Sequence, residues 1–117
     1  MSYEVTKKQN HTLIRILSDR LDANNAPDLK TEFIFNHNSG EKNIILDTEK
    51  CLYCDSTGLR SIIVGNRLCE DAIGTFIVTG LQPEVESLIR ISMLQTILLI
   101  TKTVDEAEAL LLKKESL

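Results

Sequence analysis

The chain has 117 residues, of which 43% are hydrophobic and 26% are charged, as expected of one soluble globular domain spanning 1–117. The net charge is -4, which argues against nucleic acid as a partner, because phosphate neutralisation needs clustered Lys and Arg. No apolar run is long enough to cross a bilayer, and the N-terminal residues contain no apolar signal region. We therefore expect a cytoplasmic protein that does not associate with membranes.

The first third of the chain predicts a hairpin followed by a helix. Residues 3–8 and 12–17 are extended candidates joined by a short polar turn, whereas 18–22 is polar and typical of a loop. Capping amides and Pro27 then mark the start of a helix, which ends at the turn formers of 36–40. The residues expected to face the core from this helix are Leu29 and Phe33.

The rest of the chain alternates apolar runs with helical patterns. The expected elements are strand 43–47, helix 56–70, strand 75–79, a helix from Pro83, strand 97–100 and a helix from Thr103. The spacing of Thr103 and Glu106 forms a capping box at the start of the last helix. This order predicts an α/β fold, with a mainly parallel sheet of about five strands, an antiparallel first strand and about four helices.

The stretch Asp55-Ser56-Thr57-Gly58 opens the helix predicted at 56–70. Asp, Ser and Thr can all satisfy the free N–H groups of a first helical turn, so simple capping is one interpretation. A glycine in that turn costs about 1 kcal/mol of helix stability relative to alanine. A cap has no need of Gly58, whereas a site where another molecule approaches the backbone closely does.

Two chemical roles for Ser56 are also open. A nucleophile needs a base within reach, and the two histidines, His11 and His37, lie in polar turns without a Gly-x-Ser-x-Gly motif around the serine. A phosphorylated serine, by contrast, suits a helix N-terminus, which favours anions. Phosphorylation beside Asp55 would change the local charge by about -1.5 to -2. A partner covering the turn would then have to desolvate the phosphate, and would be released.

The element order and the Asp-Ser-Thr-Gly-Leu motif at 55–59 resemble the STAS domain of bacterial anti-sigma factor antagonists. The likeness covers essentially the whole chain, and Leu21-Asp22 matches the end of the family's Gly-Glu-Leu-Asp segment. The resemblance implies that Ser56 is phosphorylated by an anti-sigma factor that is itself a serine kinase. The unphosphorylated form would bind this kinase and free the sigma factor, and a metal-dependent serine phosphatase would reset the switch. It also implies that Asp22 lies near Asp55.

The surface around Ser56 is expected to bind this partner. Arg60 departs from the small residue that is common in the family, and it could pair with a phosphate or contact an acidic patch of the partner. Val64 and Leu68 lie opposite the core stripe of the helix and form an apolar strip, unless neighbouring helices cover them. The expected partner-binding residues are Asp22, Asp55, Thr57, Gly58, Arg60 and Val64.

No residue is expected to be catalytic, and no metal or cofactor is expected to bind to this chain. It contains no Gly-rich phosphate loop, so the nucleotide and magnesium would belong to the kinase. Cys51 and Cys54 form a C-x-x-C pair that could be redox-active, but semi-buried thiols are the simpler interpretation, and the pattern does not favour zinc. The alternative function is a STAS scaffold or accessory subunit, without phosphorylation, in a stress-signalling or lipid-transport complex.

Overall fold

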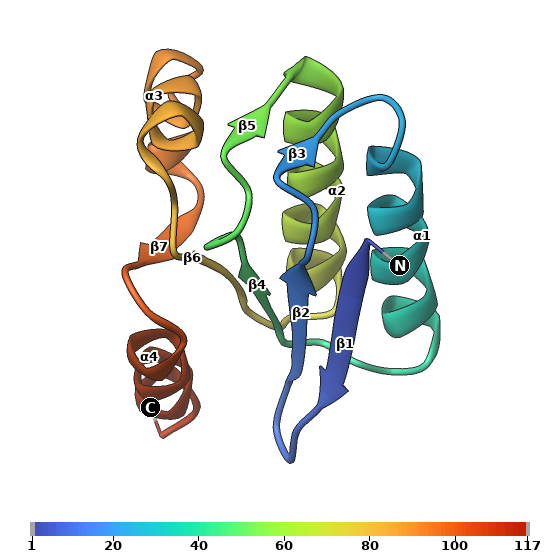
Figure 1. Cartoon of the computed structure of the whole chain (residues 1–117). Helices are drawn as coiled ribbons and strands as arrows, with labels where there is room; N and C mark the ends of the chain where they lie inside the picture. The colour runs from blue at the N-terminus through green and yellow to red at the C-terminus, as the bar shows by residue number, and fades with distance from the viewer. Residues whose placement is uncertain (1, 117) are drawn as a thin grey trace.

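The centre of the protein is a five-stranded sheet, seen in the computed structural model, which describes residues 2–116 (Figure 1). Its strand order is β1-β2-β4-β6-β7, with β1 antiparallel to β2 and every other neighbouring pair parallel. The antiparallel first strand and the mainly parallel sheet are as predicted. The strands are β1 (Tyr3–Lys7), β2 (Thr12–Ile16), β4 (Ile44–Asp47), β6 (Phe76–Thr79) and β7 (Leu99–Thr101).

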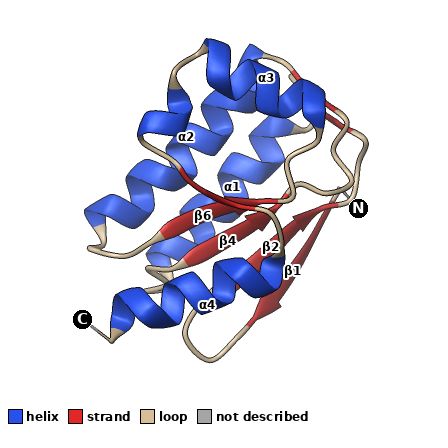
Figure 2. Ribbon diagram, turned by 90° about the vertical axis from the view of Figure 1, so that its left-hand side faces the viewer, coloured by secondary structure: helices blue, strands red, loops and turns tan. Residues whose placement is uncertain are grey.

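Helices cover both faces of this sheet (Figure 2). Three of them lie on one face and α4 lies alone on the other, so the molecule has three layers. The helices are α1 (Ala26–Asn38), α2 (Ser56–Asp71), α3 (Pro83–Ile91) and α4 (Val104–Glu115). No helix within 2–116 is long and apolar enough to cross a membrane.

The core follows from the apolar runs of the central strands. Every residue of β4 and β6 is buried, because these strands have helices against both faces. Leu29 and Phe33 of α1 point into the larger core as predicted, where the Phe33 ring meets Phe76 edge-on at a centroid distance of 5.6 Å. The smaller core beneath α4 is formed by Leu13, Ile45, Ile77, Ala107 and Leu111.

The structure differs from the sequence expectations at two short segments. Residues 18–22, predicted as a loop, contain β3 (Arg20–Leu21), which pairs in parallel with β5 (Tyr53–Cys54). The last strand begins at Leu99, two residues later than predicted, because a 3-10 helix, η1 (Leu94–Thr96), precedes it. Met93, directly before η1, has a φ of 62°, a left-handed conformation that neither a regular helix nor a strand adopts.

Capping was predicted correctly for the last helix and incorrectly for the first. The Thr103 hydroxyl accepts a hydrogen bond from the Glu106 N–H at 3.1 Å, which is one half of a capping box. The Glu106 carboxylate accepts from the Lys102 N–H at 3.0 Å, one residue before the N-cap. Asn25 occupies the N-cap position of α1, but its side chain makes no capping bond. Its amide is used elsewhere, because it accepts from the Asp22 N–H at 2.9 Å and donates to the Arg20 carbonyl at 2.7 Å.

Candidate functional site

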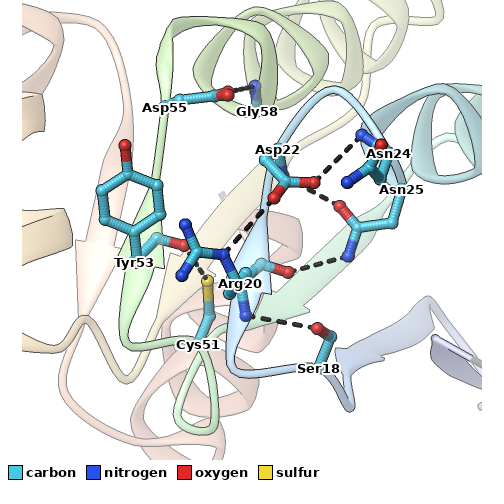
Figure 3. A network of polar contacts seen from close by, with 9 residues as sticks. All are labelled: Ser18, Arg20, Asp22, Asn24, Asn25, Cys51, Tyr53, Asp55 and Gly58. Atoms are coloured by element: carbon cyan, nitrogen blue, oxygen red, sulfur yellow. Dashed lines mark hydrogen bonds and ion pairs between the residues drawn. The ribbon is translucent and has the colours of Figure 1, made fainter.

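The two-stranded β3–β5 pair positions the Asp-Ser-Thr-Gly turn. Leu21 pairs with Cys54, and the Asp55 N–H donates to the Leu21 carbonyl at 3.2 Å. Asp22 and Asp55 therefore follow the ends of neighbouring strands and lie beside the same turn, as the family resemblance implied (Figure 3). The pairing carries residues far apart in sequence to the start of α2.

Asp55, and not Ser56, caps α2. The Asp55 backbone is extended, and its Oδ1 atom accepts a hydrogen bond from the Gly58 N–H at 2.9 Å. Ser56 is the first residue of the helix, it is exposed, and its hydroxyl bonds to none of the residues in 2–116. Because the neighbouring aspartate performs the capping, the serine hydroxyl is free to react or to meet another molecule.

Gly58 is explained by packing within the chain. A Cβ at this position would lie 2.3 Å from the Leu21 carbonyl oxygen and 2.8 Å from the Cys54 sulfur. The glycine is buried, so the close approach that the sequence suggested is made by β3 and not by a partner. This packing explains the glycine within the fold, and the expectation that Gly58 leaves room for a kinase stays a prediction.

Charged and aromatic side chains surround the turn. The Arg20 guanidinium lies over the Tyr53 ring, 4.6 Å from its centroid, and its Nε is 3.4 Å from Asp22 Oδ2. The other Asp22 oxygen accepts from the Asn24 N–H at 3.0 Å. Figure 3 shows Arg20 between Tyr53 and Asp22.

A groove between α1 and α2 begins next to Ser56. Its volume is about 260 Å³, and its lining includes Thr57, Arg60 and Val64, three of the residues predicted to bind a partner. Val64 is half-buried, whereas Leu68 packs against the main core. The predicted apolar strip is therefore partly covered, with Val64 as its accessible end. Lys30 of α1 lines the same groove, so its mouth carries two cations.

The cysteines are poor candidates for redox chemistry. Cys51 and Cys54 are 1% and 7% exposed and are not linked. Burial raises the pKa of the Cys54 thiol to about 12 and also raises that of Cys51, so both favour the unreactive protonated form. Across residues 2–116, no group of His, Cys, Asp and Glu side chains could hold a metal ion.

No histidine serves as a base for Ser56. His11 lies in the β1–β2 turn, and this turn is at the opposite end of the sheet from the start of α2 (Figure 1). Its Nε2 atom is 3.1 Å from Oε2 of Glu108 in α4. His37 lies in the last turn of α1, also far from the start of α2. The triad geometry that activates a serine nucleophile is therefore not formed by these histidines.

Three residues of this site were not predicted from the sequence: Arg20, Tyr53 and Asn25. Strands of two residues are too short to give a periodic signal, and the polar neighbours of Leu21 favoured a loop. The available signal was the alternation of one apolar residue between polar or amphipathic neighbours in 20–22 and again in 53–55. Such alternation is what two short half-buried strands would show.

Comparison with known proteins agrees with this architecture. The family model of the STAS domain matches residues 2–107. Among solved structures, an anti-sigma factor antagonist from Mycobacterium paratuberculosis has 17% identity and a TM-score of 0.83, with 93% of this chain and 92% of that chain covered. A serine-to-glutamate variant of RsbS from Moorella thermoacetica has 18% identity and a TM-score of 0.85, with both chains fully covered at 100%.

A third structure is the phosphorylated form of the Bacillus cell fate determinant SpoIIAA, which has 20% identity and a TM-score of 0.73. The match covers 96% of the SpoIIAA chain and 92% of this chain. The family match spans nearly the whole sequence, so the chain belongs to the STAS domain family.

Proposed function

We propose that this protein is an anti-sigma factor antagonist, a phosphorylation-controlled binding module and not an enzyme. In its unphosphorylated form it binds an anti-sigma factor serine kinase, and phosphorylation of Ser56 releases it. The observation that carries the proposal is the exposed hydroxyl of Ser56 at the first position of α2, left free because Asp55 caps the helix. The names of two structural neighbours, an anti-sigma factor antagonist and the phosphorylated SpoIIAA, support this assignment.

The position of Ser56 suits a reversible switch. The kinase would transfer the γ-phosphoryl group of its magnesium-bound ATP to the serine oxygen, with loss of the hydroxyl proton and release of ADP. A phosphoryl group at a helix N-terminus is tolerated by the fold, since the helix dipole favours an anion there. It adds a charge of about -1.5 to -2 beside Asp55 and Asp22, so a partner pressed onto the turn would have to desolvate it.

The partner surface consists of the turn and the mouth of the α1–α2 groove. Asp22, Asp55 and Thr57 are partly exposed, Arg60 is exposed, and Val64 supplies an apolar contact. A metal-dependent serine phosphatase would remove the phosphoryl group and restore binding. The switch would operate in the cytoplasm, where the transcription machinery that it regulates is found.

Phosphorylation is tested by incubating the chain with MgATP and its cognate anti-sigma factor kinase, followed by intact-mass measurement. The wild-type chain should gain one phosphate, and Ser56→Ala should gain none. Ser87→Ala, which removes an exposed serine of α3, is the matched control and should be phosphorylated normally. Phosphate still present on Ser56→Ala would refute Ser56 as the acceptor. Stable kinase binding without any phosphorylation would instead favour an accessory STAS subunit.

A further inference from the structure

We propose that Arg20 is the chain's own ligand for a phosphoryl group on Ser56, and that its guanidinium exchanges Asp22 for that group once the serine is modified. This inference rests on the proposed function, because it takes Ser56 as the phosphoacceptor. It assigns a regulatory contact to a residue of β3, outside the motif that contains the serine.

The pairing of β3 with β5 places Arg20 on the correct face. Side chains two residues apart on a strand point to the same side, so Arg20 and Asp22 share one face of the pair with Tyr53 and Asp55. The contacts agree, since Arg20 touches both Tyr53 and Asp22. Leu21 and Cys54 point to the opposite, buried side. Figure 3 shows the Asp22 carboxylate and the Arg20 guanidinium on this side of the strand pair, and Asp55 directly precedes Ser56 in the chain.

The guanidinium is oriented but not fully bonded. Its Cζ atom lies over the Tyr53 ring in a cation–π contact, which restrains the side chain next to β5. Its ion pair with Asp22 uses the Nε atom at 3.4 Å, beyond the usual range of N–H···O bonds, and the Arg20 side chain is 59% exposed. The Nη groups bond to none of the residues in 2–116. A planar guanidinium with free N–H groups is suited to bidentate binding of a phosphate.

The distance between Arg20 and Ser56 can be closed by the two side chains. Arg20 is the register partner of Tyr53, and paired strands lie about 4.8 Å apart. Ser56 follows Tyr53 by three residues, at most about 10 Å of chain. An extended arginine and a phosphoseryl side chain are together long enough to span a gap of this size. The exchange is favoured because the phosphate carries more negative charge than the Asp22 carboxylate. The bound guanidinium would also offset the repulsion between the phosphate and the carboxylates of Asp22 and Asp55.

Arg60 is the competing cation. It lies four residues after Ser56, so helical geometry places it one turn along the same side of α2. However, Arg60 lines the α1–α2 groove together with Lys30, and this groove opens on the other side of the turn from β5. The two candidate ligands can therefore be distinguished by experiment, since Arg20 would hold the phosphate over the strand pair and Arg60 would hold it over the groove.

The test uses the full chain with phosphoserine incorporated at position 56 during synthesis, so no kinase is needed. Phosphorus NMR then follows the second ionisation of the phosphate, whose ordinary pKa is about 6. A bound guanidinium favours the dianion, so Arg20→Gln should raise this pKa by about 0.2 to 0.7, the range expected of an exposed ion pair. Arg20→Lys should recover part of the difference, and Arg67→Gln, farther along α2, should leave the pKa at the wild-type value.

A second measurement needs no substitution. The Arg20 Nε–H resonance should move when serine at position 56 is replaced by phosphoserine, because its acceptor changes from a carboxylate to a phosphate. An unchanged phosphate pKa in Arg20→Gln, or a rise in Arg60→Gln alone, would overturn the assignment to Arg20. Such a result would leave the mass-gain test of Ser56 unaffected. A chain that no kinase phosphorylates would refute the proposed function, while the phosphate titration would still report on Arg20.

Discussion

At the scale of single residues, the site is explained by a division of roles within four consecutive positions. Asp55 caps the helix, Ser56 presents its hydroxyl to solvent, and Gly58 lets the helix start approach β3. The sequence contained the motif but left capping by serine open, because Asp, Ser and Thr are all good N-cap residues. Only the bond from the Gly58 N–H to Asp55 decides which of the three is used.

The capping role of Asp55 can be separated from its charge. Asp55→Asn retains an acceptor for the Gly58 N–H, so the free energy of unfolding should stay close to that of the wild type. Asp55→Ala removes the acceptor and should cost about 1 kcal/mol. Urea denaturation measures both variants. Equal stability of Asp55→Ala and the wild type would show that the cap contributes nothing.

Gly58→Ala should destabilise the protein even though alanine is the better helix former by about 1 kcal/mol. The new methyl group would meet the Leu21 carbonyl at 2.3 Å, so the helix start or β3 must shift. A net loss of about 1 to 3 kcal/mol is expected from overpacking of this kind. Ser56→Ala, at an exposed position, is the control and should change stability by less than about 0.5 kcal/mol. A Gly58→Ala protein as stable as the wild type would contradict this packing argument.

At the scale of elements, length and burial decided what could be predicted from the sequence. The fully buried strands β4 and β6 and the helix α2 follow from apolar runs and helical spacing. The pair β3–β5 was not predicted from the pattern, because two residues per strand are too few to show a period. Arg20 and Tyr53 were missed for this reason, although Asp22 was placed near the turn by family resemblance.

The groove between α1 and α2 is the element-scale feature that the proposed function uses. Val64→Asp places a charge in its wall, where a partner side chain would have to desolvate it. Kinase binding should weaken at least about tenfold, which corresponds to about 1.4 kcal/mol. Isothermal titration calorimetry measures the affinity, with Arg67→Ala on the same helix as the control.

Because Val64 is half-buried, a modest loss of stability is compatible with this role. The urea midpoint of Val64→Asp therefore has to be measured together with its affinity. Unfolding of the variant would show that this side chain belongs to the core, and unchanged binding by a folded variant would remove Val64 from the partner surface.

At the scale of the whole molecule, the sheet is enclosed by helices on both faces, and the cysteines lie inside the larger core. Burial raises the pKa of both Cys54 and Cys69 to about 12, from an ordinary value of 9.0. The folded state thus keeps protons that the unfolded chain loses above pH 9. The contribution of these two thiols to the pH dependence of stability therefore falls in the alkaline range.

The free energy of unfolding should therefore show no thiol-dependent change below pH 9 and should fall as the pH rises from 9 towards 12. The sign follows because a raised folded-state pKa stabilises the fold only while the thiol remains protonated. Urea titrations at a series of pH values measure the slope, and Cys69→Ala should make it shallower than in the wild type. An identical slope in Cys69→Ala would contradict the buried-thiol argument for this residue.

The proposed switch depends on one comparison. The chain with serine at position 56 has to bind the anti-sigma factor kinase more tightly than the chain with phosphoserine at that position. Isothermal titration of the kinase, loaded with ADP so that no transfer occurs, measures both affinities under the same conditions. We expect the phosphorylated chain to bind at least about tenfold more weakly, because the interface would bury an added charge. Equal affinities for the two chains would contradict the proposed switch.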